Sequence, residues 1–339
     1  FMKKYKAKYL NFFPTILVIL SITMNTCSNQ SKNSLDVQGH RGARGLRPEN
    51  TLSGFEFAMD LGVTTIEMDI GISQDLVPVV YHDAYINSKI CLSYDEPFPL
   101  DMDQHYLLKD LTLAQIQSFD CGSLNPNIEH FPEPPRINIP EENIPSLQEV
   151  FDLAKAKNSS VRFNIEIKLD PTKDETVSID LFVESVVNVI EKNNLINRVI
   201  IQSFNWAVLE RVKKLQAKII TAALLDENTG LPTESGEASP WTNGIHYKKV
   251  DESSLGLLNE AQEYVDIFSP SGLIIVQGSS VFMNSTIEEI QAAGYKVVPW
   301  TVNKKSQMEF LINLGVDGII TDYPDILISL LKEMNISVQ

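Results

Sequence analysis

Short apolar runs of β-forming residues alternate with amphipathic stretches from residue 37 onward. Repeated units of this kind predict a parallel sheet covered by helices. About eight of them in roughly 300 residues predict that the sheet closes into a (β/α)8 barrel, the TIM barrel, and a doubly wound open sheet is the alternative. No GxGxxG or GxxxxGK loop follows a predicted strand. The chain of 339 residues is long enough for one large domain.

The predicted strands are the apolar runs themselves, and most of the segments between them have a helical pattern. In residues 146–157, for example, the apolar residues fall at the spacing of one buried helix face. Asn303 can cap the next-to-last helix, and Gly315 can end it. The predicted strands cover residues 37–40, 64–70, 78–83, 161–169, 199–204, 219–225, 265–270, 296–302 and 318–322.

One stretch breaks this alternation. Residues 86–140 are rich in Pro, Asp and Asn, and the stretch is too long for a plain connection between a strand and a helix. We therefore expect a small inserted subdomain at one end of a barrel that spans residues 37–335.

The first residues have the layout of a bacterial export signal. Lysines at positions 3, 4, 6 and 8 precede an apolar run, FFPTILVILSITM, that is shorter than the roughly 20 residues of a membrane span. Cys27 lies where a lipoprotein signal places its acylated cysteine, so residues 1–26 are the predicted signal and 27–36 a tether. A plain cleaved signal or an uncleaved anchor is the alternative. All three predict an exported domain, either periplasmic or anchored to the outer membrane.

The composition is acidic, with a formal net charge of −16 that becomes about −20 without the lysines of residues 1–26. Such a surface repels nucleic acid and anionic lipid, so it argues against a polyanion partner and leaves small substrates open. In an oxidising compartment Cys91 and Cys121 would form a pair, although two separate buried thiols fit the sequence equally.

Charged residues interrupt two of the apolar strands. Because side chains alternate along a strand, Glu67 and Asp69 share one face, and Glu166 and Lys168 do the same on another strand. In a barrel the apolar face meets the helices, so we expect these ionisable groups to point inward. Three carboxylates then converge inside the barrel.

Buried carboxylates require positive charge nearby. Lys168 and Arg41 supply two charges, which leaves the cluster acidic. Carboxylate oxygens favour Ca²⁺ or Mg²⁺ over zinc. The sequence therefore predicts one divalent cation bound by Glu67, Asp69 and Glu166, and a buried ion-pair network without metal is the alternative.

Two histidines lie at predicted strand ends, His40 after the first strand and His82 after PVVY. Both are expected at the carboxyl-terminal rim, where barrel enzymes carry out their chemistry. Imidazole both donates and accepts a proton near neutral pH. Together with a cation, a guanidinium and an ammonium, two imidazoles suit the cleavage of a phosphodiester.

The sequence resembles the glycerophosphodiester phosphodiesterase family across essentially all of residues 37–335. The resemblance lies in seven motifs in the same order: HRGARGLRPENTL (40–52), IEMDI (66–70), VVYHD (79–83), IEIK (165–168), IQSFN (201–205), VPWTVN (298–303) and GIITDYP (318–324).

The resemblance implies a TIM barrel with a subdomain after the HD motif, which fits residues 86–140. It implies that His40 and His82 are the general acid and base, that Arg41 and Lys168 meet the phosphate, and that Glu49 belongs to the same polar site. The implied metal ligands are Glu67, Asp69 and Glu166. The reaction implied by the family frees an alcohol and leaves sn-glycerol 3-phosphate.

Other motif residues have two interpretations each. Trp300 and Phe204 wall the glycerol pocket or belong to the core, and Gln202, Ser203 and Asp322 are placed to line its mouth. Leu76 stands where the family often has a glycine, which bears on a turn. Two other functions remain open: phospholipase D-like cleavage of lysophospholipid or sphingolipid on the same barrel, and a lipoprotein that binds glycerophosphodiesters without catalysis.

Overall fold

The computed structural model describes residues 34–93, 105–277 and 284–339. The predicted export signal and Cys27 lie outside these ranges, as do residues 94–104 of the predicted insertion. Within the described ranges, no helix combines the length and apolar character needed to cross a bilayer.

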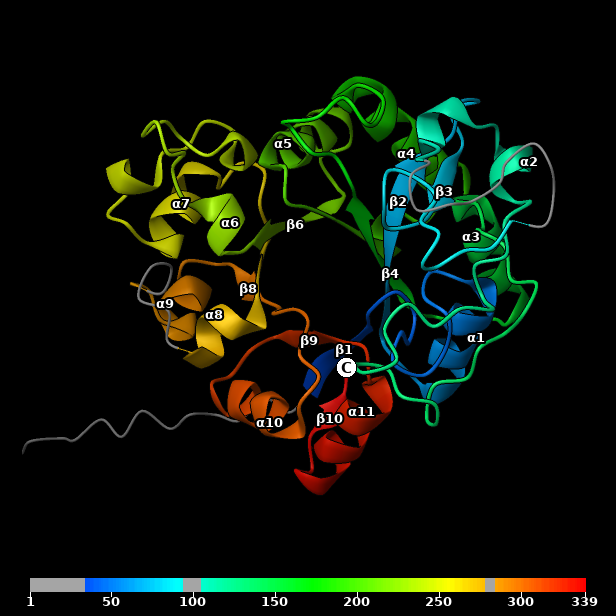
Figure 1. The fold of residues 1–339 in the computed structure, drawn as a ribbon. Coiled ribbons are helices and arrows are strands. Elements are labelled where there is room, and N and C mark those ends of the chain that lie inside the picture. The colour runs from blue at the N-terminus through cyan, green and yellow to red at the C-terminus, as the bar shows by residue number, and fades with distance from the viewer. Residues whose placement is uncertain (1–33, 94–104, 278–283) are drawn as a thin grey trace, which may run out of the picture. The chain divides into compact units, whose positions relative to one another are not determined.

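The strands form a closed inner ring (Figure 1). The ring strands are β1 (Ser34–Gly39), β2 (Thr65–Ile72), β4 (Arg162–Ile167), β5 (Val199–Ser203), β6 (Ile220–Leu225), β7 (Ile267–Pro270), β8 (Lys296–Val297) and β9 (Gly318–Thr321). From β1 to β8 each strand pairs in parallel with the next, and β9 pairs in parallel with β1. Hydrogen bonds from Asp317 N to Val297 O (2.8 Å) and from Ile320 N to Pro299 O (3.0 Å) complete the ring between β8 and β9. The predicted (β/α)8 barrel is confirmed, and the open sheet is wrong.

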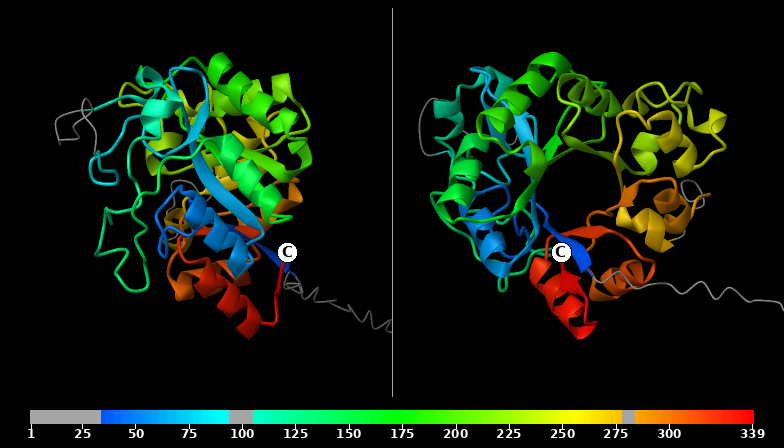
Figure 2. Two further views of the ribbon diagram at one scale, coloured as in Figure 1. Left: turned by 90° about the vertical axis from the view of Figure 1, so that its right-hand side faces the viewer. Right: turned by 180° about the vertical axis from the view of Figure 1, so that it is seen from behind.

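Helices surround the ring (Figures 1 and 2). They are α1 (Leu52–Leu61), α2 (Leu113–Ile116), α3 (Leu147–Ala156), α4 (Ile179–Lys192), α5 (Trp206–Leu215), α6 (Glu227–Gly230), α7 (Ser254–Glu260), α8 (Gly272–Gln277), α9 (Ile287–Ala292), α10 (Lys305–Asn313) and α11 (Pro324–Glu333). The 3-10 turns are η1 (Leu108–Asp110), η2 (Ile196–Arg198), η3 (Pro240–Thr242) and η4 (Tyr247–Lys249). The predicted helix at 146–157 is α3, and its predicted apolar face is buried: Leu147, Val150, Phe151 and Ala154.

The main core lies between the ring and the helices. Ile66, Met68 and Ile70 of β2 are fully buried there, as are Ile165 and Ile167 of β4. A smaller apolar cluster, separate from the main core, is formed by Ile200, Ala222, Ile267, Val298 and Ile320. Because the apolar side chains of β2 and β4 pack in the main core, their alternate residues point into the ring, as the sequence predicted.

The run at 78–83 is not a ring strand, which corrects the prediction. Its ordered part, β3 (Pro78–Val80), pairs antiparallel with β2, with Val80 opposite Ile70. The chain reverses because Ser73 and Val77 close a tight turn by hydrogen bonds, and Leu76 takes a φ of 60° within it. Leu76, which stands where the family often has a glycine, thus has a left-handed backbone conformation that favours glycine.

Three further boundaries differ from the prediction. β1 begins at Ser34, so residues 34–36 belong to the barrel and not to a tether. The ordered pairing of β8 stops at Val297, because Pro299 follows. A short strand, β10 (Ser337–Val338), pairs with β1 beyond the predicted end at 335.

The predicted cap of α10 is also wrong. The N-cap is Lys304, without a side-chain hydrogen bond, while the Asn303 side chain donates to Asp322 at 2.6 Å. Gly315, with a φ of 84°, follows the helix as predicted.

The described part of the insertion carries a small core of its own. This core includes Tyr81, Ile86, Leu108, Phe119 and Ile144. A disulfide joins Cys91 to Cys121 within it. Figure 2 shows this segment projecting from the end of the barrel opposite to the end where the chain terminates. The pairing left open by the sequence is therefore a disulfide.

Candidate active site

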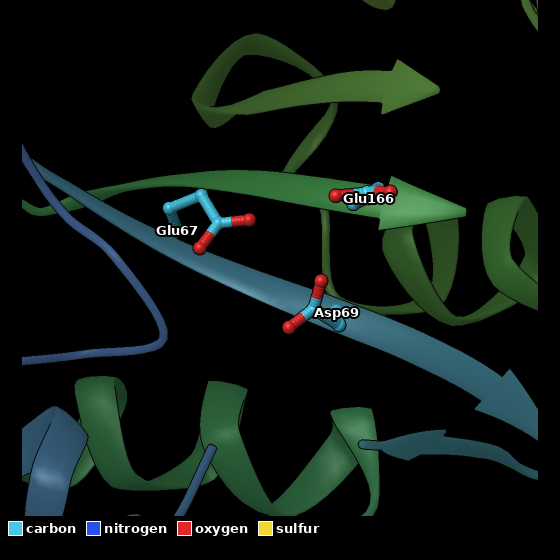
Figure 3. A group of neighbouring side chains, drawn as sticks. All are labelled: Glu67, Asp69 and Glu166. Carbon is cyan, nitrogen blue, oxygen red and sulfur yellow. The ribbon is translucent and has the colours of Figure 1, made fainter. Parts of the chain in front are cut away.

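Three carboxylates from two neighbouring ring strands meet inside the barrel (Figure 3). Glu67 and Asp69 come from β2 and Glu166 from β4, and Asp69 lies opposite Glu166 in the strand register. One oxygen from each lies within 4.8 Å of the others, and all three side chains are buried. The predicted convergence of these three acids inside the barrel is confirmed.

Two cations lie against this triad. Arg41 donates its backbone N–H to Glu67 Oε2 at 2.8 Å, and its Nε lies 3.1 Å from Asp69 Oδ2. Lys168 Nζ lies 2.8 Å from Glu166 Oε1 and 3.8 Å from Asp69 Oδ1. Burial disfavours charge on Lys168, but the carboxylates of Glu166 and Asp69 outweigh it and raise the lysine pKa.

The protein's own cations do not fully balance the triad. Burial, together with the charges of Asp69 and Glu166, raises the pKa of Glu67 well above its ordinary value. For Asp69 burial acts in the same direction, but Arg41, His82 and Lys168 outweigh it and lower the pKa. Asp69 Oδ1 is buried without a hydrogen-bond donor. An orphaned oxygen in an all-oxygen cluster fits a hard divalent cation.

His40 is held by a carboxylate on the side of the ring that faces away from the triad. Its Nδ1 lies 2.6 Å from Asp322 Oδ1, and its Nε2 lies 3.9 Å from Glu67 Oε2. Asn303 donates to the other oxygen of Asp322. Burial lowers the pKa of His40, although Asp322 opposes this effect. With Nδ1 held by Asp322, Nε2 is turned toward the triad.

His82 has the same arrangement through different residues. Its Nδ1 lies 2.6 Å from Asp83 Oδ1, and its Nε2 lies 3.0 Å from Lys168 Nζ. Since an ammonium only donates, Nε2 accepts from Lys168 and Nδ1–H donates to Asp83. Asn87 in turn donates to Asp83 Oδ2 at 2.7 Å. His82 reaches the site from the β2–β3 hairpin and not from the end of a ring strand.

Arg41 has an unusual backbone. Its φ is 49°, in the left-handed region, which turns the chain sharply after β1. Asn50, with a φ of 55°, donates to Asp69 Oδ2 at 2.9 Å, while Thr51 caps α1. Burial disfavours the charge of Arg41, but Glu49, Asp69 and Glu67 outweigh it and raise the guanidinium pKa.

Glu49 lies behind two arginines. Its carboxylate is 2.6 Å from Arg41 Nη1 and 2.6 Å from Arg44 Nε, and the residue is only 6% exposed. Burial raises its pKa, but both arginines outweigh this and the pKa is lowered. The geometry makes Glu49 a support for the arginines that face the cavity.

We call the hollow above the triad the inner cavity. It has a volume of about 260 Å³. Phe204 and Trp300 form one wall, with ring centroids 5.2 Å apart, and Trp300 donates its indole N–H to Ser269 O at 2.8 Å. The polar residues that line it are His40, Arg41, Arg44, Glu67, His82, Glu166, Lys168, Gln202 and Thr301.

A chain of buried amides supports the triad from inside the ring. Gln202 donates to Glu67 Oε1 at 2.9 Å. Asn164 donates to both Gln202 (2.9 Å) and Gln38 (2.8 Å), and Gln38 donates to Asp36 at 2.9 Å. Gln202 lines the inner cavity, and Ser203, which donates to Ile167 O at 2.9 Å, lines the neighbouring cavity, as predicted. Asp322 lines neither cavity and is buried against His40.

Several supporting residues were not predicted: Asp83, Arg44, Asn50 and the role of Asn303. Asp83 directly follows His82, so the HD pair was a usable signal. Asn50 and Asn303 each contact a residue that lies 19 positions away in the sequence, and Arg44 contacts Glu49 within its own loop.

These features define a (β/α)8-barrel enzyme with an acid cluster and two imidazoles at one end of the ring. The model of the glycerophosphoryl diester phosphodiesterase family matches residues 40–326. The chain belongs to this family.

Relatives and solved structures agree with this assignment. A glycerophosphodiester phosphodiesterase of Caldanaerobacter subterraneus is 32% identical over 88% of this chain and 98% of its own. A structure from Silicibacter pomeroyi, provisionally named a glycerophosphoryl diester phosphodiesterase, has a TM-score of 0.73 at 26% identity, covering 90% of this chain and 96% of its own. An Oleispira antarctica phosphodiesterase, solved with the product sn-glycerol-3-phosphate, has the same fold, with a TM-score of 0.61 at 23% identity, covering 88% and 96%.

Proposed function

We propose that the enzyme hydrolyses glycerophosphodiesters to sn-glycerol 3-phosphate and an alcohol. The observation that carries this proposal is the pair of imidazoles, each held at Nδ1 by a carboxylate at 2.6 Å, on the walls of one cavity that also holds Arg41 and Lys168. Family membership and the names of the relatives support the same reaction.

The phosphate would bind in the inner cavity. Arg41 and Lys168 offer N–H donors to its oxygens, and Arg44 adds a third positive charge on the same wall. The Phe204 and Trp300 rings would pack against the glycerol carbons. The charged lining favours a water-soluble diester over the acyl chain of a lysophospholipid.

Glu67, Asp69 and Glu166 would hold one divalent cation, and we propose Mg²⁺ or Ca²⁺ because every donor is a carboxylate oxygen. Such an ion supplies positive charge that stabilises the charge developing on the phosphoryl oxygens.

The two histidines would move the protons. One neutral imidazole takes the proton of the neighbouring glycerol hydroxyl at Nε2 as that oxygen attacks phosphorus. The other imidazole enters the step protonated on both nitrogens and gives its Nε2 proton to the departing alcohol oxygen. The product of this step is a cyclic phosphate. Water then opens the ring, with the two imidazoles exchanging roles, and sn-glycerol 3-phosphate is left.

The test measures release of sn-glycerol 3-phosphate from purified protein by a coupled dehydrogenase assay. We expect turnover by the wild type, and a fall in kcat of about 10²- to 10⁴-fold for His40→Ala and for His82→Ala with unchanged folding. The matched control is His130→Ala, an exposed histidine that lines neither cavity, and it should keep the wild-type rate. Near-normal kcat in either active-site variant would remove that histidine from the mechanism.

We also propose that the enzyme works outside the cytoplasm. The Cys91–Cys121 disulfide supports an oxidising compartment, and the apolar run behind the lysines at positions 3–8 supports export. Labelling with a radioactive fatty acid tests the anchor: wild-type protein should carry label and Cys27→Ala should not. Unlabelled wild-type protein would leave a plain signal as the explanation.

A further inference from the structure

A second cavity adjoins the inner cavity at the catalytic residues. We call it the outer cavity, and its volume is about 370 Å³. The two share four lining residues, His82, Glu166, Lys168 and Phe204. A diester bound at the shared wall therefore has room on both sides, one for each alcohol that is esterified to the phosphate.

The two cavities differ in charge. His40, Arg41 and Arg44 line only the inner cavity, which suits the anionic glycerophosphate half. The residues found only in the outer cavity include three carboxylates and one ammonium. They are Asp83, Asp170, Glu175 and Lys173. The outer cavity thus has a surplus of negative charge next to a site built for an anion.

Aromatic rings complete the outer cavity. Tyr85 and Trp241 line it together with the shared Phe204, and all three are half-buried. The Phe204 and Trp241 ring centroids are 6.3 Å apart, at an interplanar angle of 77°. Aromatic ring faces near carboxylates attract organic cations, quaternary ammonium groups above all.

The carboxylates near Lys173 are already arranged around an ammonium. Thr172 holds Asp170 Oδ1 through its N–H (2.9 Å) and its hydroxyl (2.6 Å), which leaves Oδ2 toward the Lys173 Nζ at 3.6 Å. Glu175 Oε2 lies 3.6 Å from the same nitrogen. These contacts are long and the lysine side chain is 55% exposed, so it can swing away from a ligand cation.

From these observations we propose that the outer cavity binds the leaving alcohol and selects head groups that carry an ammonium, such as choline and ethanolamine. The inference rests on the proposed hydrolysis and goes beyond it, since it names the class of alcohol released. Asp170, Glu175 and Trp241 are the residues that would determine this specificity.

The test compares kcat/KM for glycerophosphocholine with kcat/KM for glycerophosphoglycerol, whose head group is neutral. In the wild type we expect the ratio of kcat/KM for glycerophosphocholine to kcat/KM for glycerophosphoglycerol to exceed about tenfold, as cation–π and carboxylate contacts of this kind allow. Asp170→Asn with Glu175→Gln should lower the ratio at least about threefold through KM. Lys173→Met should raise it, because it removes the competing ammonium.

The matched control is Asp174→Asn. Asp174 lies in the same loop, but its side chain is 97% exposed and does not line the cavity, so its loss should leave the ratio unchanged. Trp241→Leu should raise KM for glycerophosphocholine more than for glycerophosphoglycerol.

A second measurement needs no variant. Choline should inhibit the wild type competitively, and dimethylbutanol, its neutral carbon isostere, should inhibit at least about threefold more weakly. Equal turnover of both diesters, or equal inhibition by both alcohols, would overturn the inference while the proposed function stands. If neither diester released glycerol 3-phosphate, the proposed function would be overturned, and this inference with it.

Discussion

Each histidine of the candidate site has a carboxylate at its Nδ1. Asp322 and Asp83 lie at 2.6 Å from the Nδ1 atoms of His40 and His82, and each has an amide donor of its own from Asn303 or Asn87. Such outer partners fix the tautomer and the direction of the ring. Asp322 is therefore expected to position His40 for the proposed proton transfer.

Asp322→Asn tests this role. Replacing the carboxylate by an amide removes the charge that favours Nδ1–H, so kcat should fall at least about tenfold while KM changes little. Steady-state kinetics on one diester provide the measurement. Asp325→Asn, in the first turn of α11, is the matched control and should keep the wild-type kcat. An unchanged kcat in Asp322→Asn would show that burial alone orients His40.

Glu49→Gln tests the buried support behind the arginines. The pKa of Glu49 is lowered in the folded protein from an ordinary value of 4.5. A lowered folded pKa contributes stability that is present above the unfolded value and lost as pH falls through the folded one. At neutral pH the variant should lose about 3 kcal/mol of unfolding free energy.

The difference between Glu49→Gln and wild type should shrink as the pH falls from 4.5 through the lowered pKa of folded Glu49, because below that pKa the wild type also carries a neutral group in both states. Urea unfolding at several pH values measures it. A difference that stays constant with pH would mean that the carboxylate charge contributes nothing.

For individual residues, the sequence predicts the reactive side chains better than the residues that hydrogen-bond to them. Strand alternation places Glu67, Asp69 and Glu166 on inward faces without knowledge of the fold. Asn303 was expected to cap a helix, and its amide turns instead to Asp322, which lies on a different loop. Local capping preferences do not include such a competing long-range acceptor.

Among the elements, the β2–β3 hairpin determines where His82 lies. The sequence placed residues 78–83 on a ring strand, because a short apolar run carries no signal for its direction. The chain reverses instead, so His82 follows a strand that runs antiparallel to the ring strands. The predicted rim position for His82 is right, but its structural reason is different.

Leu76→Gly tests the strain in this hairpin turn. Leu76 has a φ of 60° and is 44% exposed, so its side chain gains little from burial while its Cβ opposes the left-handed backbone. The glycine variant should be more stable by about 1 kcal/mol, measured by thermal or urea unfolding. Leu76→Ala, which keeps the Cβ, should show no gain. A glycine variant less stable than wild type would contradict the account.

For the whole molecule, the barrel brings together groups that are distant in the chain. The triad joins β2 to β4, His40 follows β1, and Asp322 follows β9. The alternating strand and helix pattern predicted this closure, because parallel ring strands place all their carboxyl ends on one side. The buried chain of amides from Gln202 to Asp36 could not be predicted, since it depends on the exact stagger of neighbouring strands.

The central claim is that one divalent cation binds between Glu67, Asp69 and Glu166. Calorimetric titration of chelator-treated protein with Mg²⁺ and with Ca²⁺ tests it most directly. We expect the wild type to bind one ion per chain. The Glu166→Gln variant should lose more than the about 10-fold in affinity that follows removal of a residue hydrogen-bonded to a metal ligand, because Glu166 is itself a proposed ligand. Glu175→Gln, a nearby carboxylate outside the triad, should bind as the wild type does. Wild-type protein that binds neither ion, or a Glu166→Gln variant with undiminished affinity, would contradict the account.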